Sequence, residues 1–202
     1  YKKAHTMMDK NFRKEYKFVL SSAEIENFLS IFDCKTNEIY EKREVQSLYM
    51  DTKNYDLFHK SETYDIDKYT LRYRKYSNNK IINFEVKDNS SLGKRKTSVP
   101  SKFRALKEVK TLNYKNYLTT PALYVTYTRN YYEFESARIT VDRNLNFKST
   151  VNRSLSTRIH NSYLNILEVK LLDQHSLDVE YLLLQNPQKF SKFKYGMSKI
   201  YN

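Results

Sequence analysis

The chain has 202 residues, of which 40% are hydrophobic and 29% charged, a composition typical of one folded domain that can bury its own core. Its 36 Lys and Arg residues against 23 Asp and Glu give a formal charge of +13, which favours polyanionic partners: nucleic acid, phosphate chains or an anionic membrane surface. One cysteine excludes an intramolecular disulfide, and two glycines exclude a Walker A loop or a dinucleotide-binding loop. No apolar run approaches the ~20 residues of a membrane span.

Four segments are predicted to be helical. The first begins at a capping box formed by Ser21 and Glu24 and presents one apolar stripe up to Phe32. The others are expected to cover Asn54 to Glu62, to open at Ser101 with Phe103, Leu106 and Val109 as the apolar side, and to run from Ser176 to about Leu184.

Alternation of apolar and charged residues predicts the strands of an antiparallel sheet. The alternation covers residues 12–18, 71–74, 84–87, 138–142 and 167–171, and Tyr127 with Arg129 forms a further, less apolar pair. In each segment the charged residues share one face and the apolar residues share the other. One such strand alone is typical of any sheet with a solvated face, so a single pair indicates no function.

The charged faces taken together are unusually basic. They carry Arg13, Lys17, Arg72, Arg74, Lys87, Arg129, Arg138 and Lys170, opposed by Glu15, Glu85, Asp142 and Glu168. If the strands close into a barrel with these faces inside, the lining repels itself unless an anion fills it. A phosphate chain suits this lining, because Arg forms bidentate bonds to phosphate oxygens and Lys offers a point charge. A few carboxylates could then hold a divalent cation on the phosphates.

Eight short motifs follow one another along the chain. They are residues 13–17 (RKEYK), residues 47–52 (SLYMDT), the Arg72/Arg74 pair, Glu85-x-Lys87, Tyr127-x-Arg129, residues 138–142 (RITVD), Leu167-Glu168-x-Lys170 and residues 190–193 (FSKF). Their order resembles the VTC domain, the polyphosphate polymerase domain of the vacuolar transporter chaperone family and its stand-alone bacterial relatives, within the triphosphate tunnel metalloenzyme superfamily. The resemblance extends from about Phe12 to Tyr201.

The resemblance implies an α+β fold: an antiparallel eight-stranded β-barrel that forms a triphosphate tunnel, with a few helices packed outside. A single domain of residues 1–202 is expected, with residues 1–10 as a flexible N-terminal segment. The implied function is transfer of the γ-phosphate of ATP to a growing polyphosphate chain with Mn²⁺ or Mg²⁺, in the cytoplasm. The implied ligands are ATP or another triphosphate and polyphosphate, without a specific nucleic acid; a partner protein in a membrane or envelope-assembly system stays open.

Two other functions remain open from the residues. The tunnel could bind polyphosphate or a nucleotide without turnover and serve a partner protein. Alternatively, the charge of +13 could bind nucleic acid non-specifically. The residues alone do not decide among the three.

The resemblance also assigns roles to individual positions. It assigns phosphate binding to Lys17, Arg72, Arg74, Lys87, Tyr127, Arg129, Arg138, Lys189, Ser191 and Lys192. Further candidates for the tunnel wall are Arg13, Lys94, Lys96 and Lys170, and the pair Ser198-Lys199 is an alternative to Ser191-Lys192. Glu168 is the expected metal ligand, with Glu15 and Glu85 as further candidates, although pairing with tunnel cations would also explain these two.

Three acidic or basic positions have different interpretations. Asp51 is expected to cap a helix or turn, and Asp142 is expected to be the structural partner of an arginine. The hydrolytic branch of the superfamily carries Glu-x-Glu-x-Lys on its first strand, whereas Arg13 occupies the first of these Glu positions here. This departure argues against the hydrolase and cyclase branches.

Overall fold

One antiparallel sheet organises the protein. The computed structural model describes residues 15–31, 35–36, 41–63, 67–90, 93–134, 137–150, 158–161, 164–171 and 186–201. Eight strands pair in the order β1-β11-β9-β8-β3-β4-β5-β6, while β2 and β7 pair with β8, and β10 pairs with β9. The expected eight-stranded antiparallel fold with helices packed around it is therefore confirmed.

The elements follow the chain in this order. The strands of the sheet are β1 (Glu15–Leu20), β2 (Lys35–Thr36), β3 (Arg43–Asp51), β4 (Lys68–Tyr76), β5 (Asn83–Ser90), β6 (Gly93–Pro100), β7 (Leu112–Tyr114), β8 (Tyr117–Phe134), β9 (Ala137–Ser149), β10 (Arg158–Asn161) and β11 (Asn165–Leu171). The helices are α1 (Ser22–Ile31), α2 (Asp56–Glu62), a 3₁₀ turn η1 (Leu106–Glu108) and α4 (Lys192–Tyr201).

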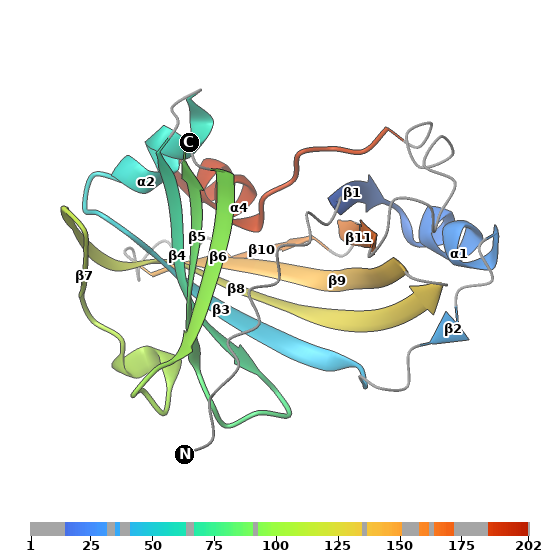
Figure 1. Cartoon of the computed structure of the whole chain (residues 1–202), viewed down its shortest axis with the longest axis horizontal. Helices are drawn as coiled ribbons and strands as arrows, with labels where there is room; N and C mark the ends of the chain where they lie inside the picture. Colours follow the sequence, from blue (N-terminus) through green and yellow to red (C-terminus); the bar gives the residue numbers. More distant parts are fainter. Residues whose placement is uncertain are drawn as a thin grey trace, which may run out of the picture.

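The sheet curls into a half-barrel. In Figure 1, β4, β5 and β6 run steeply across the direction of β3, β8 and β9, so the two halves of the sheet face one another around a concave side. The register shifts between Tyr49 and Met50 in the β3–β8 pair, and between Thr126 and Thr128 in the β8–β9 pair. Such irregularities increase local twist and bend a sheet. Within the described residues, β1 and β6 form the two edges and do not pair with each other.

Helix α1 covers the outer, apolar face of β1, β11 and β9. Its capping box forms as predicted: the Ser21 N–H donates to Glu24 Oε2 over 2.7 Å, and the Glu24 N–H donates to Ser21 Oγ over 3.3 Å. Ile25, Phe28 and Leu29 are the buried residues of the helix. They belong to one cluster with Phe18 and Ile139 of the sheet.

The first turn of helix α2 is bound by a buried carboxylate. Asp51, the last residue of β3, accepts hydrogen bonds from the N–H groups of Leu57 over 2.9 Å and Phe58 over 3.0 Å. These bonds satisfy backbone donors of the first helical turn. Burial raises the pKa of Asp51 to about 6, although the N–H bonds act in the opposite direction. The expectation that Asp51 is a cap is confirmed.

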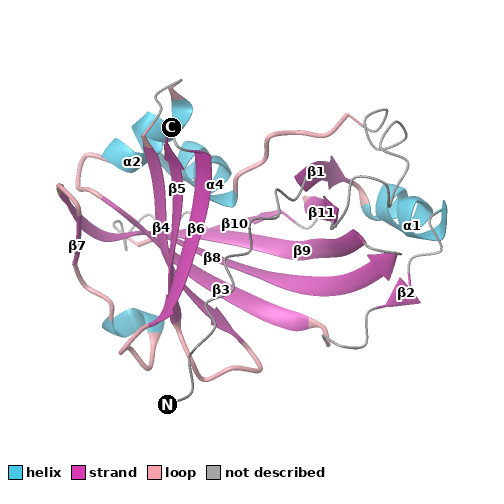
Figure 2. Ribbon diagram, in the orientation of Figure 1, coloured by secondary structure: helices cyan, strands magenta, loops and turns pink. Residues whose placement is uncertain are grey.

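Two helical segments differ from the sequence expectation. After Ser101 only the 3₁₀ turn η1 forms, because Phe103 packs edge-on against Tyr73 (5.4 Å, 81°) while Leu106 and Val109 are buried in the same cluster on the outer sheet face, and these contacts hold the segment against the sheet. Helix α4 forms where only a short motif was expected (Figure 2). The helix expected over Ser176 to Leu184 and the N-terminal segment of residues 1–10 lie outside the described residues.

Helix α4 packs across one end of the concave side. Phe193 and Met197 are buried with Val45, Tyr49 and other side chains of β3, β8 and β9. Gly196 lies so close to the sheet that a Cβ atom there would be 2.6 Å from Leu123 Cδ2 and 2.7 Å from Phe147 Cδ1. Among the described helices, none has the length and apolar character that crossing a bilayer requires.

Candidate functional site

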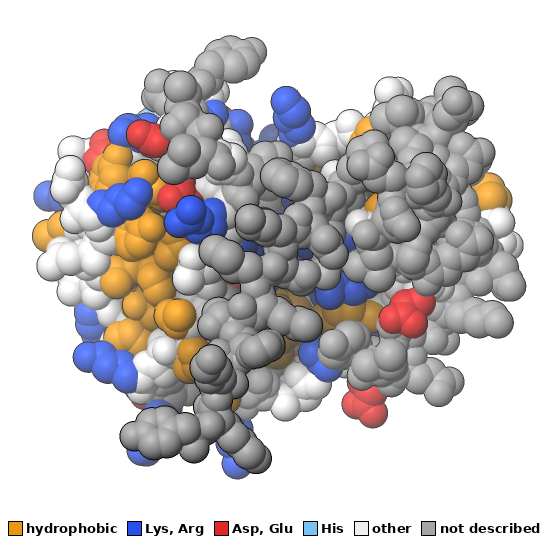
Figure 3. Space-filling view, in the orientation of Figure 1, with side chains coloured by type: hydrophobic (Ala, Val, Ile, Leu, Met, Phe, Trp, Pro, Cys, Tyr) orange, Lys and Arg blue, Asp and Glu red, His pale blue; other side chains and the backbone are white. Residues whose placement is uncertain are grey.

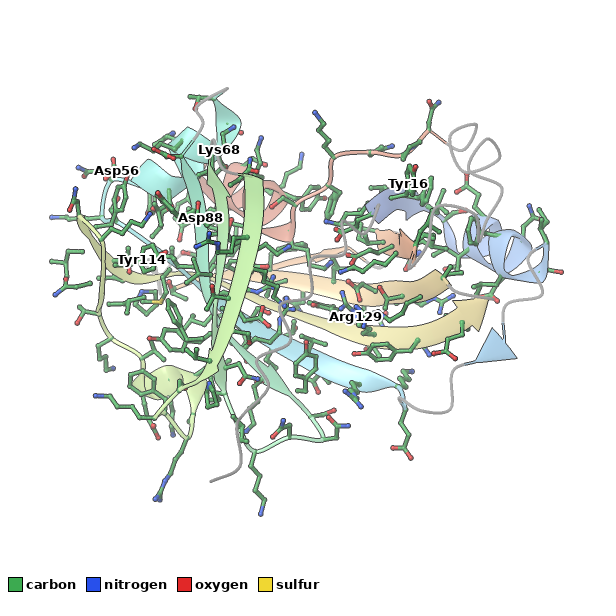
Figure 4. All side chains as sticks on the ribbon, viewed as in Figure 1. Tyr16, Asp56, Lys68, Asp88, Tyr114 and Arg129 are labelled. Atoms are coloured by element: carbon green, nitrogen blue, oxygen red, sulfur yellow. The ribbon has the colours of Figure 1, made fainter. Side chains whose placement is uncertain are left out.

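Cross-strand register brings the charged residues onto one side of the sheet, here called the concave face. Lys17 lies opposite Glu168, Lys170 opposite Arg138, Arg129 opposite Asp142, Arg72 opposite Glu85, and Lys87 opposite Lys96. With Lys192 of α4, the face carries the cations Lys17, Arg72, Arg74, Lys87, Lys96, Arg129, Arg138, Lys170 and Lys192, against the carboxylates Glu15, Glu85, Asp142 and Glu168. Figure 4 shows Arg129 over β8 and β3, inside the curl of the sheet. The cations exceed the carboxylates about two to one, so this face attracts anions.

The first cluster holds two arginines on one carboxylate. Arg72 Nε donates to Glu85 Oε2 over 2.7 Å, and Arg74 Nη1 lies 3.6 Å from the same oxygen. All three side chains are almost fully buried. Burial would raise the pKa of Glu85, but Arg72 and Arg74 outweigh it and lower the pKa to about 2. Glu85 is therefore ionised at neutral pH and fixes both guanidinium groups in place.

The second cluster repeats this arrangement with a lysine. Arg129 forms a bidentate pair with Asp142 through bonds of 2.6 and 2.7 Å, and Lys192 Nζ lies 2.6 Å from Asp142 Oδ2. Burial would raise the pKa of Asp142, but the two cations hold it below its usual range. Asp142 is thus the partner of an arginine, as predicted from the sequence.

The third cluster has two carboxylates and two lysines at the β1–β11 edge. Lys170 Nζ lies 2.8 Å from Glu168 Oε1 and 3.3 Å from Glu15 Oε2, so both carboxylates converge on one ammonium group. Lys17 Nζ lies 2.7 Å from Glu15 Oε1. Burial would raise the pKa of Glu168, but Lys170 and Lys17 lower it well below the usual range. Glu15 and Glu168 therefore meet at one ammonium group, that of Lys170, and Glu168 is ionised.

Two buried hydroxyl groups on the concave face lack a hydrogen-bond partner among the described residues: those of Tyr127 and Thr140. The Tyr127 ring lies beneath Lys192 (4.7 Å) and Arg129 (5.5 Å). Burial raises the pKa of Tyr127 to about 12, so the phenol stays protonated at neutral pH. A buried donor without a partner is costly in a folded protein. The Tyr127 hydroxyl is thus available to a ligand oxygen.

Lys87 lies near the middle of this electropositive region. Although Lys87 is exposed, surrounding protein atoms disfavour its charge, and Arg72 and Lys17 repel it. These effects lower the pKa of Lys87 to about 7. The opposite residue, Lys96, lies 3.3 Å from Glu85 Oε1 and is half exposed.

The two C-terminal candidate pairs, Ser191-Lys192 and Ser198-Lys199, lie in different environments. Lys192 is 11% exposed and bound to Asp142, whereas Lys199 is exposed and lies 6.0 Å from the ring of Tyr195 on the same helix. Ser191 Oγ accepts the Lys194 N–H over 3.4 Å and thereby caps α4, and Ser198 Oγ donates to the Tyr195 carbonyl. The structure therefore brings Lys192 to the concave face, and leaves Ser198 and Lys199 on the body of α4.

The remaining candidates are placed less directly. Lys189 is exposed in the segment before α4, which is tied to β1 because the Gln188 N–H donates to the Lys17 carbonyl over 2.7 Å. Arg138 is half-buried on β9. Arg13 and the side chain of Lys94 lie outside the described residues.

Sequence reasoning missed Tyr49. Its hydroxyl accepts a hydrogen bond from Arg72 Nη1 over 3.2 Å, and its ring stacks on Phe193 of α4 (5.3 Å, 23°). Burial would raise the pKa of Tyr49, but Arg72, Arg74 and Lys192 lower it. The period-two alternation of Ser47 and Tyr49 within residues 47–52 was the available signal, because Ser47 Oγ likewise accepts from Arg74 Nε over 3.1 Å.

Comparison with known proteins agrees with this arrangement. The family model described as the VTC domain matches residues 12–201. No curated protein matches the chain. A solved structure of a candidate adenylate cyclase from Bacillus halodurans has 13% sequence identity and a TM-score of 0.60, covering 94% of this chain and 97% of that one.

Two further solved structures share the fold. A candidate adenylate cyclase from Vibrio parahaemolyticus has 13% identity and a TM-score of 0.53, covering 93% of this chain and 98% of that one. A candidate adenylyl cyclase from Hippeastrum, described as having a dominant triphosphatase activity, has 13% identity and a TM-score of 0.52, covering 93% and 96%. At this identity the three structures establish the fold alone.

Proposed function

Because this chain belongs to the VTC domain family, we propose that its concave face binds a triphosphate and transfers the γ-phosphate of ATP to a growing polyphosphate chain. The observation that carries this proposal is the paired anchoring of cations. Glu85 pairs with Arg72, Arg74 and the half-exposed Lys96, and Asp142 pairs with Arg129 and Lys192, so each carboxylate serves at least two cations. Each cluster therefore keeps an excess positive charge in a fixed geometry.

Phosphoryl transfer needs mainly positioning and charge neutralisation, and no covalent enzyme intermediate. Arg72 contacts Glu85 through Nε and Nη2 and donates from Nη1 to Tyr49, whereas Arg129 contacts Asp142 through Nε and one Nη. A guanidinium group has five N–H donors, so both arginines keep donors for phosphate oxygens. Tyr127 would donate its hydroxyl to a phosphate oxygen, and its high pKa keeps the proton on the phenol. Fixed cations lower the barrier because they need no reorganisation during transfer.

The residues present fit a divalent cation, Mn²⁺ or Mg²⁺, at the third cluster. Glu168 and Glu15 converge on the Lys170 ammonium, so this position already favours positive charge. Among the described residues no group of three or more His, Cys, Asp or Glu side chains could hold a metal ion. Glu168 and Glu15 would therefore share the ion with phosphate oxygens, a donor set that Mg²⁺ accepts. When bound, the ion would neutralise charge on the donor phosphates.

The alternative is a tunnel that binds polyphosphate or a nucleotide without turnover. The observation in its favour is that both carboxylates of the third cluster are already neutralised by Lys17 and Lys170. In such a protein the lysines would replace the metal, and the site would bind phosphate chains with no need of a divalent cation.

The deciding experiment is incubation of the purified protein with ATP and Mn²⁺, with and without a short polyphosphate primer, followed by gel staining for polyphosphate. Glu168→Gln is compared with Glu62→Gln, a control that alters an exposed carboxylate on α2. Triphosphate binding by each variant is measured by calorimetry without metal.

Polymer formed by wild type and Glu62→Gln, but not by Glu168→Gln, supports the polymerase, provided that Glu168→Gln still binds triphosphate. No polymer from any variant, together with tight triphosphate binding that Arg72→Ala removes, would favour the binding module. Unchanged triphosphate binding by Arg72→Ala and Arg129→Ala would contradict both.

A further inference from the structure

A second basic region lies outside the concave face. Residues 101–118, which include η1 and β7, contain five Lys or Arg residues and a single acidic residue, Glu108. The five cations are all exposed: Lys102, Arg104, Lys107, Lys110 and Lys115. Glu108 accepts the backbone N–H of Arg104 over 3.0 Å and is thus turned back onto its own segment. This short stretch therefore presents charge of almost one sign.

The same segment packs on the outer face of β4 and β5 and leaves aromatic side chains partly open to solvent. Tyr114 and Tyr117 lie 5.7 and 6.3 Å from Tyr69, and Phe103 packs against Tyr73. Val99, which lies opposite Phe84 in the sheet, is 46% exposed. Figure 3 shows hydrophobic side chains gathered at the left of the view, with several Lys and Arg and a few acidic side chains around them.

We propose that this surface, the aromatic-basic face formed by residues 101–118 and the outer side of β5 and β6, docks on an anionic lipid surface. The charge is complementary to anionic headgroups, and each Lys or Arg near such a membrane strengthens binding by roughly fivefold. Tyr and Phe side chains with neighbouring lysines suit the boundary between headgroups and acyl chains.

Contacts within the face support this assignment. Lys115 donates to the Tyr69 hydroxyl over 2.6 Å, lies 4.1 Å from that ring, and is 4.0 Å from Asp88 Oδ2 of β5, so it neutralises this carboxylate of the face. Lys60 of α2, beside the face, contacts Tyr117 in the same way, with 2.7 Å to the hydroxyl. Lysine ammonium groups therefore lie beside tyrosine rings and hydroxyls on this side of the sheet, a combination of apolar ring and polar end that suits a membrane interface. Tyr114 is well separated from Arg129 in Figure 4, so docking leaves the concave face to its own ligand.

Two other occupants fit less well. A second copy of this chain, related by a two-fold axis, would place the five cations opposite the same five cations, which is repulsive. A nucleic acid would satisfy the charge but would leave the exposed Val99 and the aromatic edges without an apolar partner. A lipid surface satisfies both features. The inference is independent of the proposed polymerase function.

Charge reversal on the face is the first arm of the test. Vesicles of phosphatidylcholine with and without phosphatidylserine are sedimented with the protein, with and without tripolyphosphate, which would compete with lipid headgroups for the concave face. We expect binding that needs phosphatidylserine, that weakens with salt, and that Lys107→Glu/Lys110→Glu lowers at least roughly 25-fold. The matched control, Lys42→Glu/Lys148→Glu, reverses two exposed lysines beside β3 and on β9 and should bind like wild type.

The absence of Trp from the chain provides the second arm. Val99→Trp places a single fluorophore on the face, and Ile31→Trp places one at an equally exposed position of α1, where Ile31 is 53% exposed. Emission of the Val99→Trp variant should shift to the blue with anionic vesicles and be quenched by brominated acyl chains, while that of Ile31→Trp stays unchanged. Equal loss of binding in both double variants, no sedimentation by wild type, or emission of the Val99→Trp variant that vesicles do not alter would each overturn the proposal.

Discussion

The Lys192 ammonium lies 2.6 Å from Asp142 Oδ2, so the first residue of the last helix is bonded to the same carboxylate that orients Arg129. Asp142 is 1% exposed, and both cations lie within a buried cluster. The position of α4 and the geometry of the anion-binding side chains are therefore coupled through one residue.

Asp142→Asn should destabilise the protein by about 3–5 kcal/mol, because it leaves two buried cations without their shared counter-charge. Urea unfolding monitored by circular dichroism gives this value. Glu26→Gln, which breaks the exposed pair between Glu26 and Arg143, is the control and should cost at most about 1 kcal/mol.

The Asp142→Asn variant should also be rescued by its ligand. A triphosphate supplies the missing negative charge, so saturating tripolyphosphate should raise the melting temperature of this variant by more than that of wild type. Equal increases for the two proteins would contradict placement of the ligand beside Arg129 and Lys192.

The two lysines of α4 should differ in function. Lys192→Ala should lower the rate of polymer formation by about 10²-fold, because it removes a fixed cation from the reacting phosphates. Lys199→Ala removes an exposed lysine from the same helix and should keep the wild-type rate. Initial rates at saturating ATP check this comparison, and a larger effect of Lys199→Ala would move the site to the alternative pair Ser198-Lys199.

Binding of a triphosphate should draw a proton onto Lys87. At pH 7 a group with a pKa of about 7 is half protonated, and nearby phosphate charge raises that pKa, so uptake of up to about half a proton is expected. Calorimetry in two buffers of different ionisation enthalpy measures the uptake. It should be lost in Lys87→Met and kept in Lys80→Met, which alters an exposed lysine in the β4–β5 turn.

The same lysine should affect stability in the absence of ligand. Because the folded pKa of Lys87 is below that of the unfolded chain, the unfolded state binds more protons between about pH 7 and 10.5. The contribution of Lys87 to the free energy of unfolding should therefore rise with pH across this window. The difference between wild type and Lys87→Met, measured by urea unfolding at several pH values, should follow that sign; an opposite slope would argue that Lys87 is not desolvated.

Gly196→Ala should be destabilising although alanine favours helices. The added Cβ would come within 2.7 Å of both Leu123 and Phe147, and overpacking of this kind costs about 1–3 kcal/mol, of which about 1 kcal/mol is returned by helix propensity. Thermal unfolding checks the net loss, with Ser198→Ala on the same helix as control. Triphosphate affinity should fall as well, because a displaced α4 withdraws Lys192 from Asp142.

Much of the fold could be predicted from period-two alternation. Successive side chains of a strand point to opposite faces, so the charged face of residues 15–17 and 168–170 could be read directly, and the register of β1 with β11 then brought Lys17 opposite Glu168. The capping box at Ser21 and Glu24 was equally local, because its bonds join residues three apart.

The contribution of α4 could not be predicted in the same way. Phe193, Gly196, Met197 and Ile200 have the spacing of a helical stripe, which was the available signal for the helix itself. The contacts of Lys192 with Asp142 and Tyr127, however, depend on where α4 meets the sheet. The segment after Ser101 shows the opposite case, since tertiary contacts of Phe103 and Leu106 replaced a helix that local spacing favoured.

The closeness of Gly196 to the sheet has an evolutionary consequence. Any side chain at this position would push α4 outward, and a lysine four residues earlier would then fall short of its carboxylate. Positions 142, 192 and 196 should therefore change together among descendants of a common ancestor. Lineages in which a larger residue has replaced the glycine should also have lost the acidic residue or the basic one, and an alignment of many such chains would reveal this covariation.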